Sequence, residues 1–100
     1  MYNSLKLTLY TQEDCGYCKL LKKKLSEWNF DYREINISHD LFAKDFLKEK
    51  GHRTVPQLYW NDTHVNKLPT TELTYEHVCA ELDYENYIGG VENWGTAQRA

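Results

Sequence analysis

The chain has little of several features that would otherwise define its class. None of its apolar runs approaches the ~20 residues that a membrane-spanning helix needs, and its first six residues contain no apolar signal-peptide segment. Its 12 Lys and Arg against 15 Asp and Glu give a formal net charge of −3, without the basic excess that nonspecific nucleic-acid binding requires. We therefore expect neither a membrane nor a nucleic acid as partner.

Cysteine and repetition are also scarce. The chain has three cysteines, an odd number, whereas small secreted scaffolds usually carry an even set. This count favours a reducing compartment and predicts a cytoplasmic location. The 100 residues contain no internal repeat or low-complexity segment and predict one domain. We place that domain at 1–83 and expect 84–100, where the periodicity is lost, to be an irregular extension.

Two of the three cysteines form the motif Cys15-Gly16-Tyr17-Cys18, between a strand-like run and a helix-like run. A thiol at the start of a helix faces free backbone N–H groups and the positive end of the helix dipole, and both favour the thiolate. The thiolate is the nucleophile of disulfide exchange. We therefore predict a redox site in which Cys15 attacks and Cys18, one turn later, resolves the mixed disulfide.

Two other interpretations of the cysteine pair remain open. The pair could form half of a zinc site, which needs two further ligands. Cys79 is available, and so are four histidines: His39, His52, His64 and His77. No second CxxC and no HxxxH pattern accompanies them. The pair could also be a structural disulfide, although the odd cysteine count argues against a disulfide scaffold. We favour the redox site and expect no metal.

Hydrophobic periodicity predicts an α/β fold with elements in the order β-α-β-α-β-β-α. The expected strands are 5–10, 30–37, 57–60 and 63–66, and the expected helices are 15–28, 38–50 and 69–82. Ser38 is expected to cap the second helix, Phe42 and Phe46 to reach the core, and Gly51 to end that helix.

The first expected helix has two different faces. Its buried stripe would contain Cys18, Leu21, Leu25 and Trp28. Much of the remaining surface carries Lys19, Lys22, Lys23 and Lys24, which we interpret as a solvated face. In the third expected helix, Cys79 shares a face with apolar residues and is most simply a buried small hydrophobe.

The order of the elements, the Cys15–Cys18 motif and the segment Thr54-Val55-Pro56-Gln57 before the third strand together resemble the glutaredoxin family. The resemblance spans about residues 5–82. It implies a thioredoxin-like fold, a four-stranded mixed sheet with helices on both faces. It also implies a glutathione-dependent thiol–disulfide oxidoreductase that reduces protein disulfides and glutathione mixed disulfides. Ribonucleotide reductase is the natural family-level partner, and a monomer is expected.

The resemblance also implies a glutathione site. Pro56 would be cis and would lie beside the cysteines, and the backbone of Val55 would bind the cysteinyl part of glutathione like an added strand. Tyr17 would form one wall of the groove. The full expected set is Tyr17, Gln12, Arg53, Thr54, Val55, Pro56, Thr70 and Thr71.

Two residues depart from the common family pattern. Gly16 stands where most dithiol members have proline, and some nonproline members bind an iron–sulfur cluster across a dimer with glutathione as co-ligand. Gln12 stands where many members have a lysine that pairs with the glycyl carboxylate of glutathione, a task that Arg53 or Lys19 would then take over. A thioredoxin-like reductant recycled by a flavoprotein reductase is therefore an alternative. The cluster-binding dimer is a second one that we do not favour.

A third departure concerns the family's Gly-Gly-acidic motif, which normally ends the fourth strand. Asn66 and Lys67 stand there, whereas a similar sequence, 89–92, comes only after the third expected helix. Either Thr70 and Thr71 replace the usual contacts to the glutamyl end of glutathione, or a helix has been inserted before the motif. We favour the first interpretation.

Overall fold

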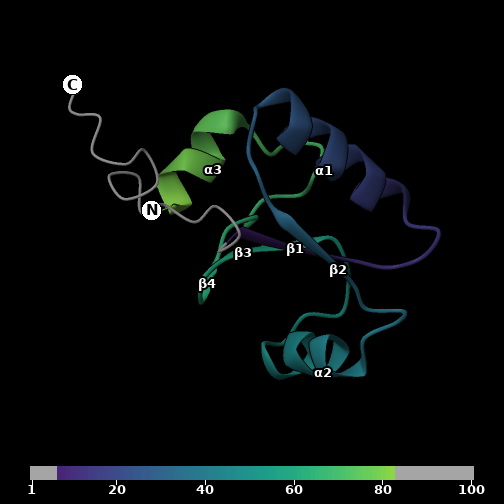
Figure 1. The fold of residues 1–100 in the computed structure, drawn as a ribbon. Helices are drawn as coiled ribbons and strands as arrows, with labels where there is room; N and C mark the ends of the chain where they lie inside the picture. Colours follow the sequence, from purple (N-terminus) through teal and green to yellow (C-terminus); the bar gives the residue numbers. More distant parts are fainter. Residues whose placement is uncertain (1–6, 83–100) are drawn as a thin grey trace.

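The computed structural model describes residues 7–82, which form a four-stranded sheet with helices on both faces (Figure 1). The strands are β1 (Leu7–Thr11), β2 (Arg33–Asn36), β3 (Gln57–Trp60) and β4 (Thr63–His64). The helices are α1 (Gly16–Glu27), α2 (Leu41–Glu49) and α3 (Tyr75–Glu81). The predicted 84–100 extension and the Gly-Gly-acidic sequence at 89–92 lie outside the described residues. Within 7–82, no helix is long and apolar enough to cross a membrane.

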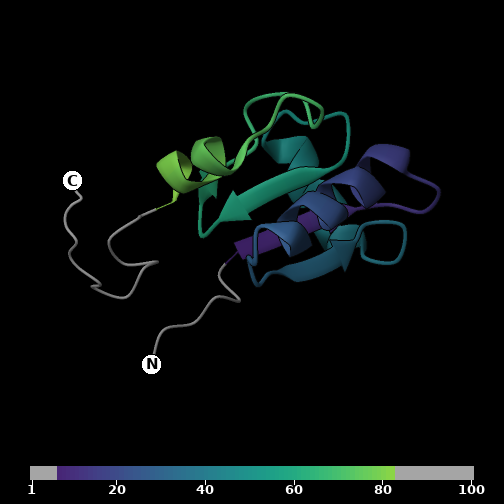
Figure 2. The same ribbon diagram turned by 90° about the horizontal axis from the view of Figure 1, so that it is seen from above.

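The sheet has the strand order β2-β1-β3-β4. The strands β1 and β2 run parallel and are connected through α1, while β3 is antiparallel to both β1 and β4. Helices α1 and α3 cover one face and α2 covers the other, as two perpendicular views show (Figure 2). The predicted architecture, a four-stranded mixed sheet with helices on both faces, is confirmed.

The main core lies between the sheet and α1. Leucines of three elements are fully buried there: Leu7, Leu9, Leu21, Leu25 and Leu58. The predicted stripe of α1 is largely confirmed, because Cys18 is buried with its leucines, while Trp28 is half-buried at the margin of the core. Because burial of an aliphatic side chain contributes about 1.5–3 kcal/mol, this face of α1 anchors the segment that carries the cysteines.

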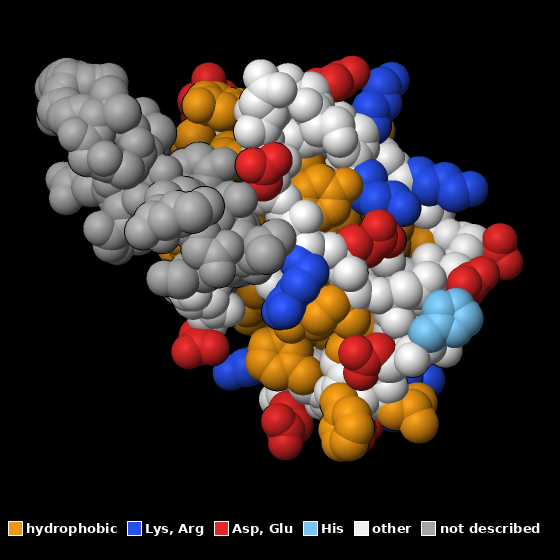
Figure 3. Space-filling model, in the orientation of Figure 1, with side chains coloured by type: hydrophobic (Ala, Val, Ile, Leu, Met, Phe, Trp, Pro, Cys, Tyr) orange, Lys and Arg blue, Asp and Glu red, His pale blue; other side chains and the backbone are white. Residues whose placement is uncertain are grey.

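The prediction for the core face of α2 is wrong at Phe42. That side chain is 90% exposed, beside Leu41 at 73%, and apolar side chains are visible in this region at the lower edge of the molecule (Figure 3). Ala43 and Leu47, one turn apart, face the sheet instead. Phe46 is half-buried between aromatic rings of β1 and β3. The helix is capped by Asp40, whose carboxylate accepts from the Ala43 N–H, and not by Ser38.

The predicted limits of other elements also shift. The second strand begins at Arg33, not at residue 30, and the fourth ends at His64. The third helix begins at Tyr75, because Thr74 has extended backbone angles and its hydroxyl accepts from the His77 N–H as an N-cap. Thr70 and Thr71 therefore lie in a turn before α3, not inside it.

Two expectations near the ends of helices are confirmed. Gly51 follows α2 with φ +85°, a conformation that favours glycine. Cys79 of α3 is half-buried against the main core, and burial raises the pKa of its thiol. Cys79 is therefore packed as a small hydrophobe.

Candidate active site

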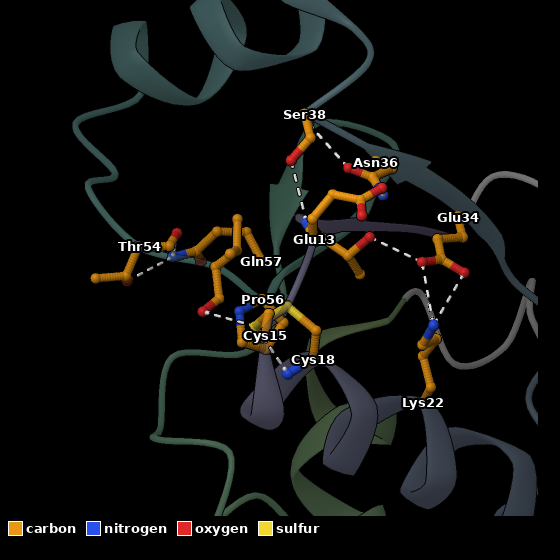
Figure 4. The surroundings of a disulfide bond; sticks show 12 residues. Glu13, Cys15, Cys18, Lys22, Glu34, Asn36, Ser38, Thr54, Pro56 and Gln57 are labelled. Carbon is orange, nitrogen blue, oxygen red and sulfur yellow. Dashed lines mark hydrogen bonds and ion pairs between the residues drawn. A yellow bond between two sulfur atoms is a disulfide. The ribbon is translucent and has the colours of Figure 1, made fainter.

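Cys15 and Cys18 are joined by a disulfide at the N-terminal end of α1, with their Cα atoms 5.2 Å apart (Figure 4). Cys15 is the N-cap residue, with extended backbone angles, and its Sγ accepts a hydrogen bond from the Cys18 N–H at 3.1 Å. Cys15 is half-buried, whereas only 2% of Cys18 is exposed. A partner disulfide can therefore approach Cys15 more readily than Cys18.

The peptide bond between Val55 and Pro56 is cis, and Pro56 lies beside Cys15 (Figure 4). The cis geometry implied by the resemblance is confirmed. The Sγ atom of Cys15 lies 3.9 Å from the carbonyl oxygen of Val55. Pro56 is buried, whereas Val55 is half-buried and lines open space beside Cys15.

Two polar side chains hold this loop in place. Asn66 is buried; its Oδ1 accepts from the Leu58 N–H at 2.8 Å and its Nδ2 donates to the Pro56 carbonyl at 3.0 Å. The Gln57 amide donates to the Thr54 carbonyl at 2.9 Å. Sequence reasoning assigned Asn66 no role. The available signal for a buried role of Asn66 was its position directly after the apolar Val65, at the end of the expected strand.

Replacing Asn66 with aspartate should separate its two contacts. The carboxylate can still accept from the Leu58 N–H but cannot donate to the Pro56 carbonyl. We expect a loss of about 1–3 kcal/mol in the free energy of unfolding, measured in urea, because a buried acceptor loses its donor. The matched change Asn61→Asp, at an exposed turn, should cost less than about 0.5 kcal/mol. Equal losses in the two variants would contradict this role of Asn66.

A groove of about 550 Å³ runs beside the cysteines, and we call it the Tyr17 groove. It contains six of the eight residues predicted to bind glutathione: Tyr17, Thr54, Val55, Pro56, Thr70 and Thr71. Tyr17 is 61% exposed, which is unusual for a ring of this size and leaves it available to a ligand. The structure therefore brings this part of the predicted set together.

The far wall of the Tyr17 groove is held by Lys24 of α1. Its Nζ donates to the carbonyl of Thr70 at 2.7 Å and to that of Leu73 at 3.0 Å. Lys24 is half-buried, so the interpretation of the four lysines as one solvated face is wrong at this position. The other lysines include Lys22, which pairs with Glu34 of β2 at 3.3 Å.

Gln12 and Arg53 lie in a second groove, of about 740 Å³, which we call the basic groove. It meets the Tyr17 groove at His52, Thr54 and Val55, which line both. Lys44 and Lys48 of α2 also line it, whereas Lys19, offered as a replacement for the missing family lysine, lines neither groove. The predicted glutathione residues are thus divided between two adjoining grooves.

The loop that leads into Cys15 is tied to the loop after β2. The Glu13 N–H donates to Ser38 Oγ at 3.1 Å, and Glu13 Oε2 lies 2.7 Å from His39 Nε2 (Figure 4 shows the Ser38 contact). Asp14, with φ +55°, makes the final turn before the N-cap. Single-sequence patterns do not reveal such contacts because the two loops are about 25 residues apart.

The rings of two histidines, His52 and His64, contact each other in a tilted arrangement beside β3. The ring centroids of His52 and His64 are 4.6 Å apart. His52 Nε2 is 2.7 Å from the Tyr59 hydroxyl, and His64 Nε2 is 2.7 Å from Gln57 Oε1. Since Gln57 uses its amide nitrogen on Thr54, its oxygen accepts and His64 donates. Burial lowers the pKa of His52, and burial together with the nearby charge of His52 lowers the pKa of His64.

These lowered pKa values make a prediction about stability. Below the ordinary imidazole pKa of ~6.5 the unfolded chain binds more protons than the folded chain, so stability should fall from pH 7 to pH 5. The variant carrying His52→Gln and His64→Gln should lose less stability over this range, measured as the shift in urea midpoint. His77→Gln, at an exposed position of α3, should follow the parent chain. An unchanged slope in the double variant would contradict the prediction.

The described part of the chain contains no group of three or more His, Cys, Asp or Glu side chains placed to hold a metal ion. The zinc interpretation of the CxxC motif would need such a group, and Cys79 and the histidines do not assemble one with the cysteine pair within residues 7–82.

Comparison with known proteins identifies the family. The glutaredoxin family model matches residues 7–65, more than half of the chain. The chain belongs to the glutaredoxin family. A Mycobacterium tuberculosis relative named as a candidate glutaredoxin is 40% identical over 58 residues, which cover 56% of this chain and 69% of the relative. The glutaredoxin-like protein NrdH of Escherichia coli is 29% identical over 58 residues, covering 58% of this chain and 72% of the relative.

Solved structures of other glutaredoxins share the fold. The E. coli NrdH-redoxin, described as having a thioredoxin-like activity profile, superposes with a TM-score of 0.55 at 29% identity, covering 58% of this chain and 76% of that one. A buckwheat glutaredoxin–glutathione complex gives 0.53 at 28% identity, covering 63% and 61% of the two chains. Family membership together with the Cys15–Cys18 pair makes this glutaredoxin a thiol–disulfide oxidoreductase.

Proposed function

We propose that the chain reduces protein disulfides and glutathione mixed disulfides, with Cys15 as the nucleophile and Cys18 as the resolving thiol. The observation that carries the proposal is the position of Cys15 Sγ, which accepts from the Cys18 N–H at 3.1 Å at the start of α1. The same donor would stabilise a thiolate in the reduced protein, and the helix dipole favours negative charge there. The greater exposure of Cys15 supports the same order of attack.

The proposed cycle transfers two electrons to the substrate. The Cys15 thiolate attacks one sulfur of the substrate disulfide, forms a mixed disulfide and releases the other sulfur as a thiolate. The Cys18 thiolate then attacks Cys15 Sγ, which releases the second substrate thiolate and leaves the Cys15–Cys18 disulfide. One glutathione thiolate reopens that disulfide, and a second removes the first as glutathione disulfide.

We propose that glutathione lies across the loop that contains Thr54 and Val55, which line both grooves. Its cysteinyl backbone would pair with Val55, and its glutamyl end would lie in the Tyr17 groove near Thr70 and Thr71. Its glycyl carboxylate would then lie toward Gln12 and Arg53 in the basic groove. Support comes from the 3.9 Å distance between Cys15 Sγ and the Val55 carbonyl oxygen and from the two grooves that meet at Val55.

A recycling assay tests the proposal directly. The oxidised chain should be reduced by glutathione with NADPH and glutathione reductase, and it should then reduce a glutathionylated peptide and a protein disulfide. The same reactions with NADPH and thioredoxin reductase serve as the comparison. Turnover that requires thioredoxin reductase and shows no dependence on glutathione would overturn the glutathione part of the proposal.

A reductant recycled by a flavoprotein reductase is the second candidate. It is favoured by Gln12, an uncharged residue in the glycyl end of the expected site, and by Asn66, whose polar groups are already occupied by Leu58 and Pro56. It also agrees with the thioredoxin-like activity profile described for the E. coli NrdH-redoxin. Ribonucleotide reductase, implied by the family resemblance, is a proposed protein substrate under either candidate.

We propose further that a domain over 1–83 performs this function as a cytoplasmic monomer and that 84–100 is an addition to it. The described core supports the first part, since the sheet, the helices and both grooves all lie within 7–82. Thr70 and Thr71 remain the proposed contacts for the glutamyl end of glutathione.

A further inference from the structure

The basic groove has an unbalanced charge. Lys44, Lys48 and Arg53 line it and are all exposed, and its described lining contains no Asp or Glu. The salt bridges found within residues 7–82 involve Lys22, His39 and Lys67, so the three cations of the basic groove form none there. They are available to a ligand.

The fold adds only a small opposing charge. The C-terminal end of α2, which carries Lys48 and is followed by Gly51, forms part of the lining. A helix C-terminus carries a partial charge of roughly −0.5, which three full positive charges outweigh. The groove therefore has a positive potential although the whole chain has a formal net charge of −3.

The groove passes beside Cys15 and reaches α2. Val55, whose carbonyl oxygen lies 3.9 Å from Cys15 Sγ, lines the groove. Lys44 and Lys48 of α2 line it as well. Glutathione has a single residue after its cysteine, and in the pose proposed above that residue reaches Gln12 and Arg53. A protein segment has further residues after its cysteine, and these would follow the groove toward Lys48 and Lys44.

We propose that the basic groove selects protein substrates with acidic residues directly after the reactive cysteine. This inference rests on the proposed thiol exchange at Cys15 and names the class of protein that the site prefers. Lys44 and Lys48 are its specificity residues, and Arg53 serves both glutathione and protein substrates. The attraction acts mainly on association and is screened by salt beyond ~8 Å at physiological ionic strength.

Single-turnover kinetics with short peptides test the proposal. Each peptide carries one cysteine in mixed disulfide with thionitrobenzoate, and attack by the Cys15 thiolate forms the Cys15–peptide disulfide and releases the coloured thionitrobenzoate anion. Three peptides of equal length have three Glu after the cysteine, three Glu before it, or neutral residues throughout. At low salt the first peptide should react about tenfold faster than the neutral one, and the advantage should shrink in 0.5 M NaCl, a salt concentration at which the screening length is only a few ångströms.

Charge-reversal variants assign the effect to the groove. The variant Lys44→Glu with Lys48→Glu should remove the advantage of the first peptide, measured as the ratio of its rate to that of the neutral peptide with the same variant. The control variant Lys23→Glu with Lys50→Glu changes the net charge by the same amount at exposed positions outside both grooves, and it should keep most of the advantage.

Each outcome has a defined meaning. If the neutral peptide reacts but the first peptide has no advantage, or if acidic residues before the cysteine work equally well, the groove does not select as proposed and the thiol chemistry stands. An equal effect of both charge-reversal variants would attribute the preference to net charge and overturn the assignment to the groove. If no peptide releases thionitrobenzoate, the proposed function itself fails.

Discussion

Replacement of Cys15 with serine is expected to abolish thiol exchange, with a rate loss on the order of a thousandfold or more in every assay, because the other thiol at this helix end, Cys18, is buried from a substrate disulfide. Cys18→Ser should behave differently. The mixed disulfide between Cys15 and glutathione can be resolved by a second glutathione, so some turnover of glutathionylated substrates should remain, while reduction of protein disulfides should fail.

Two measurements establish this difference. Initial rates with a glutathionylated peptide and with a protein disulfide should be compared for the parent chain and both variants. Circular dichroism should show the same fold for all three, since Cys15 is a cap at the surface. Normal rates in Cys15→Ser, or the reverse order of the two variants, would show that the nucleophile has been assigned to the wrong cysteine.

Replacement of Leu58 with alanine is expected to have the largest effect on stability among simple core changes. Leu58 is fully buried at the centre of β3 and pairs across the sheet with Leu9. Loss of its side chain should lower the free energy of unfolding by about 2–5 kcal/mol, since both transfer energy and cavity formation contribute. The same substitution at Leu41, which is 73% exposed, should cost less than about 0.5 kcal/mol.

The pair of leucine variants is compared by urea unfolding followed by circular dichroism and by tryptophan fluorescence. Coincident transitions with the two probes would justify a two-state treatment. A small domain of this type should lose roughly 4–8 °C in melting temperature for each kcal/mol, so Leu58→Ala should melt far below the parent chain. Similar losses at Leu41 and Leu58 would mean that α2 packs differently from the described arrangement.

The parts of the fold that could be predicted from sequence depend on local patterns. Alternating leucines identified β1, the helical spacing of Leu21 and Leu25 identified the buried face of α1, and the CxxC motif located the site. The cis bond at Pro56 was reached through the family resemblance, because proline alone leaves cis a minority state.

The parts that were missed depend on contacts between distant segments. Phe42 was placed in the core because it lies one turn from Phe46, but the buried face of α2 is formed by Ala43 and Leu47, and Phe42 is exposed. Lys24 has the sequence environment of a surface lysine, and only the turn at Thr70, 46 positions later, gives its ammonium group two acceptors. No pattern within one sequence encodes either contact.

The meeting of the two grooves at Val55 has a kinetic consequence. One stretch of backbone can pair with only one extended chain at a time, so under the proposed function an oxidised protein and the reductant that restores the dithiol would compete for the same position. We expect the enzyme to work by a ping-pong scheme, in which the first product departs before the electron donor docks, and excess donor to inhibit competitively against the oxidised protein.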